Sequence, residues 1–397
     1  MVTRRADVAV IGAGVLGTFH ALFAARKGCK TVLIERNEYP NDASTRNFGM
    51  IARSIVAADS PWAAYARASA EIYRSLQEEC DISVWVTGSL YLASTELERR
   101  VLREFAQADA NATRTAGSAE SAAESAAVYL DGEDACHRYP FVRDTYCRGA
   151  LLFPDDLTLE PRRMLRQVIP HLARQGLVEY VPHTTALSVK RSGQGCMVTD
   201  NRGTTTAADR VIVCGGADCR TLFPGLLEDS GLRLCKLQMM QTTTQPLGTL
   251  PHAILSGLSI RRYPAFASCP SYRALLDEPI DERLRAHGIH LLFKQAHDGA
   301  VVIGDSHQYA SLEDAGLLEE STNPPITSAI LAYGRRMLDL PSWDIERLWN
   351  GYYLVHPERE IYTETIDDAI HIVTGVGGKG MTTGPGYARH SIETLIP

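Results

Sequence analysis

The cysteines of this sequence indicate neither a disulfide framework nor a zinc site. The 397 residues include nine cysteines, an odd number, and no two of them form a C-x-x-C pair. Evenly paired or closely spaced cysteines are the usual signature of disulfide-stapled domains and of structural zinc. We therefore expect reduced, buried thiols, as is typical of a cytoplasmic protein, and no metal site.

The sequence also lacks an excess of basic charge. Its 40 Lys and Arg residues stand against 47 Asp and Glu residues, a formal net charge of −7 at pH 7. Nucleic acid requires a basic surface, so we expect no nucleic-acid partner. Hydrophobic residues make up 45% and charged residues 22%, which indicates a globular protein of two to three domains.

Signals for secretion or membrane insertion are weak as well. Few residues precede the first expected strand, which leaves no room for the regions of a signal peptide. The apolar stretch 6–25 contains three glycines and His20, and a basic pair follows it, so a membrane span is disfavoured. We expect a cytoplasmic protein without a transmembrane segment.

The first forty residues carry the strongest local pattern. A short apolar strand is expected at 7–11, and Gly-Ala-Gly-Val-Leu-Gly follows at 12–17. A helical stretch at 18–27 and a second strand at 30–34 come next, and Glu35 ends the unit. A glycine motif in this strand–helix–strand order predicts a dinucleotide site.

Each glycine of the motif has a physical task. Gly12 makes the tight turn, Gly14 admits a pyrophosphate to the backbone at a helix N-terminus, and Gly17 lets helix and strand pack closely. Glu35 can accept hydrogen bonds from both ribose hydroxyls. This unit alone leaves FAD and NAD as alternatives.

Four further segments point to a family. They are Ser44–Met50 after the second strand, 176–182 before a hairpin-like stretch at 186–207, the strand and glycine pair 208–216, and the glycine loop 370–381. In this order they resemble the FAD-dependent amine oxidases related to D-amino-acid oxidase, glycine oxidase and sarcosine oxidase. The resemblance covers nearly the whole chain.

A closer resemblance rests on shorter motifs. Within the family, the chain looks most like a branch of flavin oxidoreductases associated with organophosphonate catabolism. The residues that carry this match lie at 46–50, 88–90, 257–266 and 375–382.

The resemblance implies a mixed α/β architecture of the D-amino-acid-oxidase type. A Rossmann-like FAD domain is expected from 1–80, 145–225 and 345–397. A substrate domain built on an antiparallel sheet is expected from 81–144 and 226–344.

The resemblance also implies FAD as the cofactor. Some sarcosine oxidases attach the flavin through a cysteine, but the matching segment 349–357 contains none, so we expect non-covalent FAD. The expected cofactor contacts are Gly12, Ala13, Gly14, Val15, Leu16, Gly17, Glu35, Arg36, Thr45, Arg46, Asn47, Phe48, Gly49, Met50, Val181, Cys214, Gly215, Gly216, Gly377, Gly378, Lys379, Gly380, Met381 and Thr382.

The substrate anion is where the sequence departs from its relatives. Glycine and D-amino-acid oxidases carry a Gly-x-Arg-Pro motif whose Arg clamps the substrate carboxylate. The matching stretch here is Gly351-Tyr-Tyr-Leu354, with Tyr353 in place of that Arg. Either another cation binds the anion, or the acid is not a carboxylate.

Several side chains are candidates for the substrate site, and each has an ordinary alternative role. Arg46 can instead bind a backbone carbonyl or a flavin phosphate, and Lys379 can serve the flavin alone. Arg261 and Arg262 alternate on an expected strand, so at most one faces inward. The expected substrate contacts are Arg46, Asn47, Arg262, Tyr263, Tyr353, His356 and Lys379, and His307 is a further candidate for facing the cleft.

The expected reaction is oxidation of the C–N bond of an aminophosphonate, such as 2-aminoethylphosphonate or an N-alkylated or hydroxylated derivative. No obligatory base is expected. Arg46 and Lys379 are candidates for the substrate anion, and Lys294 for activating oxygen, although a surface role is the ordinary one for a lysine. The alternatives are a sarcosine- or glycine-type amine oxidase, a 2-hydroxyacid dehydrogenase, and a flavoprotein subunit without turnover of its own. Oxygen and another acceptor both remain open, as does the oligomeric state.

Overall fold

The N-terminal motif forms a parallel strand–helix–strand unit in the computed structural model, which describes residues 2–115 and 125–396. The unit consists of β1 (Val2–Ile11), α1 (Val15–Arg26) and β2 (Thr31–Ile34). Residues 15–25 of α1 are all buried, so this helix lies inside the molecule and is apolar on every side.

The first large sheet grows from β1. Its strand order is β10-β11-β12-β1-β2-β9, and β20 pairs with both β12 and β19. The strands β9, β2, β1, β12 and β20 run parallel, whereas the hairpin β10–β11 and the edge strand β19 are antiparallel. The remaining bounds are β9 (Val178–Val181), β10 (Ala186–Ser192), β11 (Gly195–Asp200), β12 (Thr205–Val213), β19 (Tyr362–Ile366) and β20 (Ile370–Thr374).

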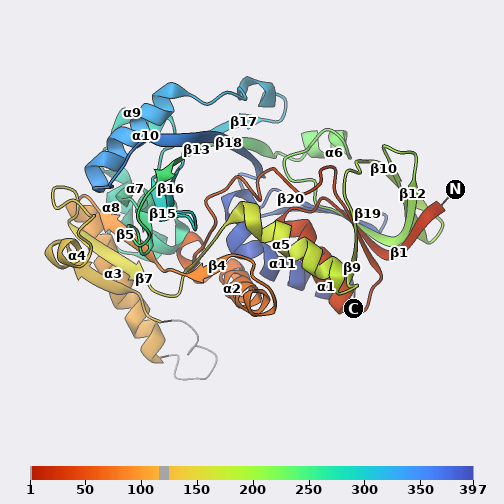
Figure 1. The fold of residues 1–397 in the computed structure, drawn as a ribbon, viewed down its shortest axis with the longest axis horizontal. Helices are drawn as coiled ribbons and strands as arrows, with labels where there is room; N and C mark the ends of the chain where they lie inside the picture. The colour runs from red at the N-terminus through yellow and green to blue at the C-terminus, as the bar shows by residue number, and fades with distance from the viewer. Residues whose placement is uncertain (1, 116–124, 397) are drawn as a thin grey trace.

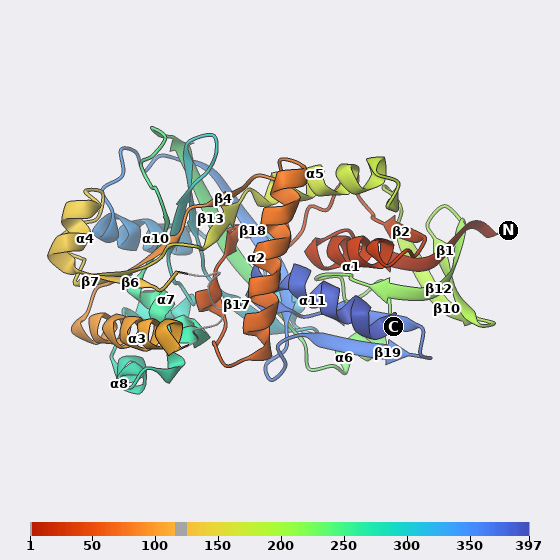
Figure 2. The same cartoon turned by 90° about the horizontal axis from the view of Figure 1, so that it is seen from below.

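Helices α1, α2 (Pro61–Glu79) and α11 (Gly380–Leu395) pack together beside this sheet. Figure 2 shows α2 crossing α11, with α1 next to them. One buried apolar cluster joins them, with Phe19 and Tyr73 in edge-to-face contact at 5.5 Å between ring centroids. This packing holds the N-termini of α1 and α11 in fixed positions.

The second large sheet has the order β17-β13-β16-β15-β14-β5-β7-β6, with β18 paired to β13. It is antiparallel except between β5 and β14. Its strands are β5 (Ser89–Ala93), β6 (Val128–Asp131), β7 (Gly149–Phe153), β13 (Arg233–Thr244), β14 (Ala253–Leu255), β15 (Leu292–Gln295), β16 (Ala300–Gly304), β17 (Gln308–Ser311) and β18 (Ile345–Val355).

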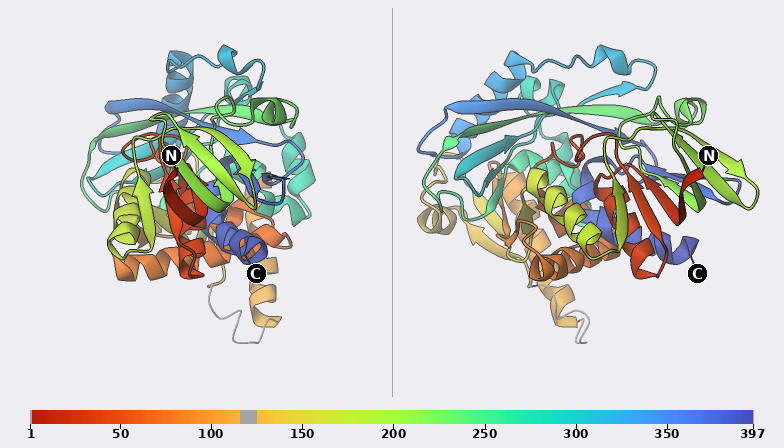
Figure 3. Two further views of the ribbon diagram at one scale, coloured as in Figure 1. Left: turned by 90° about the vertical axis from the view of Figure 1, so that its right-hand side faces the viewer. Right: turned by 45° about the vertical axis from the view of Figure 1, so that its right-hand side comes forward.

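The two sheets lie at opposite ends of the molecule, and both chain termini lie at the end with the first sheet (Figure 1). The long strands β13 and β18 run from the second sheet towards the first (Figure 3). β7 and β18 belong to the second sheet although the expected ranges assign 145–225 and 345–397 to the cofactor domain. The domain ranges themselves stay a prediction.

The other elements surround these sheets. A small sheet combines β3 (Met50–Ile51), β8 (Leu157–Leu159) and β4 (Val84–Val86). The remaining helices are η1 (Arg53–Ile55), α3 (Glu96–Thr115), α4 (Gly132–Arg138), α5 (Pro161–Arg174), α6 (Pro224–Glu228), α7 (Gly257–Arg262), η2 (Pro264–Ser268), α8 (Tyr272–Asp277), α9 (Glu282–Ala286), η3 (Ala315–Leu317), α10 (Pro324–Met337) and η4 (Gly377–Lys379).

One local expectation is wrong. Arg261 and Arg262 were expected on a strand, but they form the last turn of α7. All nine cysteines are free thiols. Among the residues that the structure describes, no helix has the length and apolar character needed to cross a membrane.

Candidate active site

Two connected cavities run between the sheets. The larger, of about 400 Å³, is bordered by 14–17, 46–50, 351–355 and 374–381. The smaller, of about 120 Å³, continues from it toward the end of β2. They share six lining residues, which makes them one elongated space: Gly14, Ala43, Ser44, Cys214, Gly216 and Thr374.

The glycines of the first motif allow a backbone approach that no side chain would permit. Gly12 has φ +92°, and a Cβ there would lie 2.3 Å from Cys214 O. A Cβ on Gly17 would lie 1.8 Å from Gly12 O. The N-terminus of α1 therefore opens directly on the cavity, where its amides favour an anion such as a pyrophosphate.

Glu35 and Arg36 line the smaller cavity. The buried Glu35 carboxylate accepts hydrogen bonds from Ala13 N at 2.9 Å and Asn37 N at 3.0 Å. Arg36 forms ion pairs with Asp218, at 3.2 Å, and with Asp42. Glu35 is thus fixed at the end of β2, the place where a ribose is bound in the dinucleotide fold.

The C-terminal glycine loop closes the other side of the larger cavity. Gly375 and Gly377 have φ near +67° and +64°, which bend the chain from β20 into η4 and α11. A Cβ on Gly378 would lie 3.5 Å from Tyr353 Oη. A second helix N-terminus, that of α11, therefore meets the same cavity.

The structure brings most of the expected cofactor residues to these cavities. Four of them line neither one, namely Ala13, Thr45, Val181 and Thr382. Val181 O accepts a hydrogen bond from Glu35 N at 3.0 Å, and Thr382 Oγ1 donates to Met50 O at 3.3 Å.

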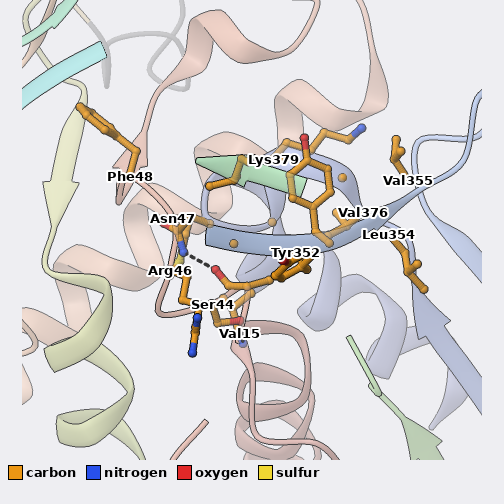
Figure 4. A pocket seen from close by; sticks show the side chains of 18 of the residues that line it. Val15, Ser44, Arg46, Asn47, Phe48, Tyr352, Leu354, Val355, Val376 and Lys379 are labelled. Carbon is orange, nitrogen blue, oxygen red and sulfur yellow. Dashed lines mark hydrogen bonds between the residues drawn. The ribbon is translucent and has the colours of Figure 1, made fainter. Parts of the chain in front are cut away.

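Arg46 and Lys379 border the larger cavity but are engaged elsewhere. Arg46 donates to Asn41 O at 2.7 Å and to Asn350 O at 3.2 Å. Lys379 pairs with Glu360, and its ammonium lies 5.2 Å from the centre of the Trp62 ring. In Figure 4 the two side chains point to opposite ends of the labelled group, so they do not converge on one anion.

Two other expected residues have structural partners. Asn47 donates to Ala43 O at 2.9 Å and accepts from Gly49 N at 2.8 Å. His356 accepts from the backbone amides of Glu358 and Arg359, both at 3.0 Å, and lies outside the cavities.

Lys294 is neither at the surface nor at the cavity. Its side chain is 4% exposed, and its ammonium contacts Leu159 O and, at 3.3 Å, Glu160. Burial lowers the pKa of Lys294, and Glu160 opposes this.

Arg262, Tyr263 and Tyr353 do meet, at the end of the larger cavity next to the second sheet. Arg262 Nη2 donates to Tyr309 Oη at 3.2 Å. Arg262 is an exposed residue that lines this open cavity. Tyr309, from β17, was not expected at the site.

A buried polar cluster completes this end of the cavity. Asp305 Oδ1 lies 3.2 Å from His290 Nε2 and 3.8 Å from His307 Nδ1. The two imidazole rings stack with centroids 5.2 Å apart. We define these three side chains as the His–Asp–His cluster.

The charges in this region follow from burial. Burial lowers the pKa of His307 to about 3 and that of His290 well below its usual value, so both imidazoles are neutral. Burial raises the pKa of Asp305, although His307 and Arg262 oppose this. Burial lowers the pKa of Arg262, but Tyr309, Tyr353 and Asp305 raise it more, so the guanidinium keeps its charge.

Sequence reasoning missed His290, Asp305 and Tyr309. One signal could have revealed two of them, because Asp305, His307 and Tyr309 alternate in the sequence, the spacing that places side chains on one face of a strand. His290 lies on another segment, and no local pattern connects it to them.

The cluster has the spacing of a cation site. Its donor atoms lie within 4.8 Å of one another. The guanidinium of Arg262 lies close enough to shift the pKa of all three residues, and its positive charge opposes a metal ion there.

The glycine cradle, two helix N-termini and an elongated cavity define a dinucleotide-binding oxidoreductase of the flavin type. The family model described as "FAD dependent oxidoreductase" matches residues 7–394, and the chain belongs to this family. FAD is therefore its cofactor, and the cavity between Glu35 and the C-terminal glycine loop has the elements to hold it.

Known relatives agree with this family. Glycine oxidase from Bacillus licheniformis is 27% identical over 220 residues, a match that covers 53% of this chain and 54% of that protein. The match thus spans about half the length of that curated relative.

Two solved structures share the fold. Glycine oxidase from Geobacillus kaustophilus and L-alpha-glycerophosphate oxidase from Mycoplasma pneumoniae, the latter with FAD bound, each give a TM-score of 0.76 at 16% identity. Each comparison covers 99% of this chain and 95% of the other.

Proposed function

We propose that this chain oxidises the C–N bond of a small amine that also carries an anionic group. The substrate class that we favour is an aminophosphonate, such as 2-aminoethylphosphonate or an N-alkylated or hydroxylated derivative. The imine product would hydrolyse to an aldehyde and an amine or ammonia. The observation that carries this proposal is Arg262, a charged guanidinium that faces the cavity and has no carboxylate of the described residues within ion-pair distance.

FAD, when bound, accepts the hydrogen and the electron pair that leave the substrate carbon. The chain supplies position and charge. Amides at the N-termini of α1 and α11 favour negative charge on the pyrophosphate and on the reduced ring. The segment 349–357 contains no cysteine, which favours non-covalent attachment.

A phosphonate suits the donors around Arg262. It presents three acceptor oxygens and one to two negative charges. Burial raises the pKa of Tyr353 well above its usual value, so this phenol stays protonated and can donate a hydrogen bond. Tyr353 also stands where the resembling oxidases carry their carboxylate-binding arginine.

A second candidate is a secondary amine of the sarcosine or glycine type. The similarity to the glycine oxidase from Bacillus licheniformis favours it. In that case Arg262 would bind the substrate carboxylate through two parallel hydrogen bonds.

Anaerobic flavin absorbance distinguishes these substrates. The purified protein is mixed in turn with 2-aminoethylphosphonate, its N-methyl form, sarcosine, glycine and a 2-hydroxyacid. We expect the flavin band to bleach with a phosphonate. Bleaching by sarcosine or glycine alone would refute the phosphonate and support the second candidate, and bleaching by the hydroxyacid alone would refute amine oxidation. A flavin that none of them reduces would indicate a subunit that serves a partner.

A further inference from the structure

One oxygen of the buried Asp305 carboxylate makes no hydrogen bond with the described residues. This oxygen, Oδ1, is inaccessible to water, while 13% of the side chain stays exposed beside the cavity. An unsatisfied buried carboxylate is costly, and native proteins avoid one unless it has a role. The buried Oδ1 faces the imidazoles, 3.2 Å from His290 Nε2, and a ligand in the cavity would approach the exposed part of the same carboxyl.

Each of the two imidazoles beside Asp305 makes a hydrogen bond to another residue. His290 Nδ1 lies 3.1 Å from Ser259 Oγ, and His307 Nδ1 lies 3.2 Å from Gly288 O. A carbonyl only accepts hydrogen bonds, so the proton of the neutral His307 ring sits on Nδ1. Both rings are therefore fixed and neutral, and neither balances the charge of Asp305.

A cationic group of the substrate fits this gap better than a metal ion does. His307 Nδ1, the ring nitrogen 3.8 Å from Asp305 Oδ1, is committed to the Gly288 carbonyl, so only Nε2 of this ring could bind a metal. The nearby Arg262 also repels a divalent ion more strongly than a singly charged ammonium.

We propose that Asp305 binds the ammonium group of the substrate and takes up its proton before oxidation. This inference rests on the proposed function. The N–H bond of the ammonium breaks, an O–H bond forms on the Asp305 carboxylate, and nitrogen keeps the electron pair. That pair then forms the C=N bond as the hydrogen of the neighbouring carbon leaves with its electrons for FAD. Arg262 holds the anionic end of the same substrate.

The surroundings of Asp305 favour proton uptake. Burial raises the pKa of this carboxyl, and this effect exceeds the opposing effects of His307 and Arg262. The titratable or charged groups that face it come from α7, β13, β17, β18 and the segments beside β15 and β16: Arg262, Tyr263, Cys235, Tyr309, Tyr353, His290 and His307.

The test compares Asp305→Asn with Asp298→Asn in the flavin-loaded protein. Asp298 is exposed, lies outside the cavities and precedes the same strand β16. The rate of anaerobic flavin reduction by 2-aminoethylphosphonate is followed from about pH 6 to about pH 10. In Asp305→Asn we expect a loss of about 100-fold near neutral pH, which fades as rising pH deprotonates the free amine. Asp298→Asn should match the wild type.

Binding provides a second readout. Ethylphosphonate lacks the amine, and its effect on the flavin spectrum should be the same in Asp305→Asn as in the wild type. Binding of 2-aminoethylphosphonate should weaken in the variant. A merely structural role of Asp305 would weaken both ligands and would lower the rate equally at every pH.

Each outcome has a distinct meaning. An unchanged rate and pH profile in Asp305→Asn would overturn the role of Asp305 while the proposed function stands. A wild-type protein that no anionic amine reduces would overturn the proposed function itself. Loss of flavin reduction after treatment with a chelator would assign the His–Asp–His cluster to a metal and overturn the inference. Should Asp305→Asn fail to bind flavin, Asp305→Ser is measured in the same way.

Discussion

Two adjacent arginines of α7 have opposite surroundings. Arg261 is 9% exposed and pairs with Glu98, at 3.3 Å, and with Glu278. Arg262 faces the cavity and contacts Tyr309. Successive residues of a helix point about 100° apart. Arg261 therefore points to the buried Glu98, and Arg262 points to the cavity. The sequence predicts that at most one of the two arginines faces the cleft. It does not predict which residues that arginine contacts.

Replacement of Arg262 by Gln should weaken substrate binding without loss of flavin. A hydrogen bond between charged groups contributes about 1.5–3 kcal/mol, so KM for an anionic amine should rise about 10- to 150-fold. Steady-state kinetics and the flavin-to-protein ratio measure this. An unchanged KM would refute an anion site at Arg262.

Replacement of Arg261 by Gln should instead destabilise the fold. It leaves the carboxylate of Glu98, which is 2% exposed, without its ion-pair partner. Removal of one partner of a buried pair costs about 3 kcal/mol or more. Urea unfolding should show this loss of unfolding free energy, and KM of the folded fraction should not change. A large rise in KM with normal stability would contradict this assignment.

At the scale of elements, the sequence predicted secondary structure correctly where a pattern extended over many residues. The β1–α1–β2 unit follows from its glycines and flanking apolar runs, because backbone geometry alone demands them. Arg261 and Arg262 were wrongly expected on a strand, and they lie in the six-residue helix α7. Six residues do not complete two helical turns, so their periodicity is ambiguous and tertiary contacts decide the structure.

Helix α1 should make the protein sensitive to acid through His20. This side chain is fully buried, and its Nδ1–H donates to Leu16 O at 2.7 Å. Burial lowers the pKa of His20 from 6.5 to about 4, partly opposed by the bond to Leu16. Between these values the unfolded chain binds the extra proton, so stability falls as pH falls, by about 1.4 kcal/mol per pH unit.

Urea unfolding at several pH values below 6.5 measures this slope. His20→Leu removes the titrating group and should flatten it. His307 contributes in the same direction, so a residual slope is expected in the variant. An identical slope in both proteins would contradict the assignment to His20.

At the scale of the whole molecule, the two halves of the site differed in how far sequence could predict them. The residues around Gly12 and Gly377 lie on continuous motifs, and most of them line the cavities. The substrate end draws on α7, β17 and β18 and on the segments that hold His290 and Asp305. Such a convergence depends on how distant strands of one sheet are ordered, which no local pattern reports.

FAD should stabilise the molecule as a unit. The cavity is lined by Gly14 and Cys214, which follow β1 and β12 of the first sheet, and by Tyr353 of β18 in the second, so a bound cofactor contacts both parts. A ligand at about 100 times its Kd stabilises the native state by about 2.7 kcal/mol. Tm of deflavinated protein should therefore rise with FAD concentration in one transition. Trp349 on β18 and Trp62 on α2 report this by fluorescence. Two transitions, of which FAD shifts only one, would mean that the halves fold independently and that the cavity does not couple them.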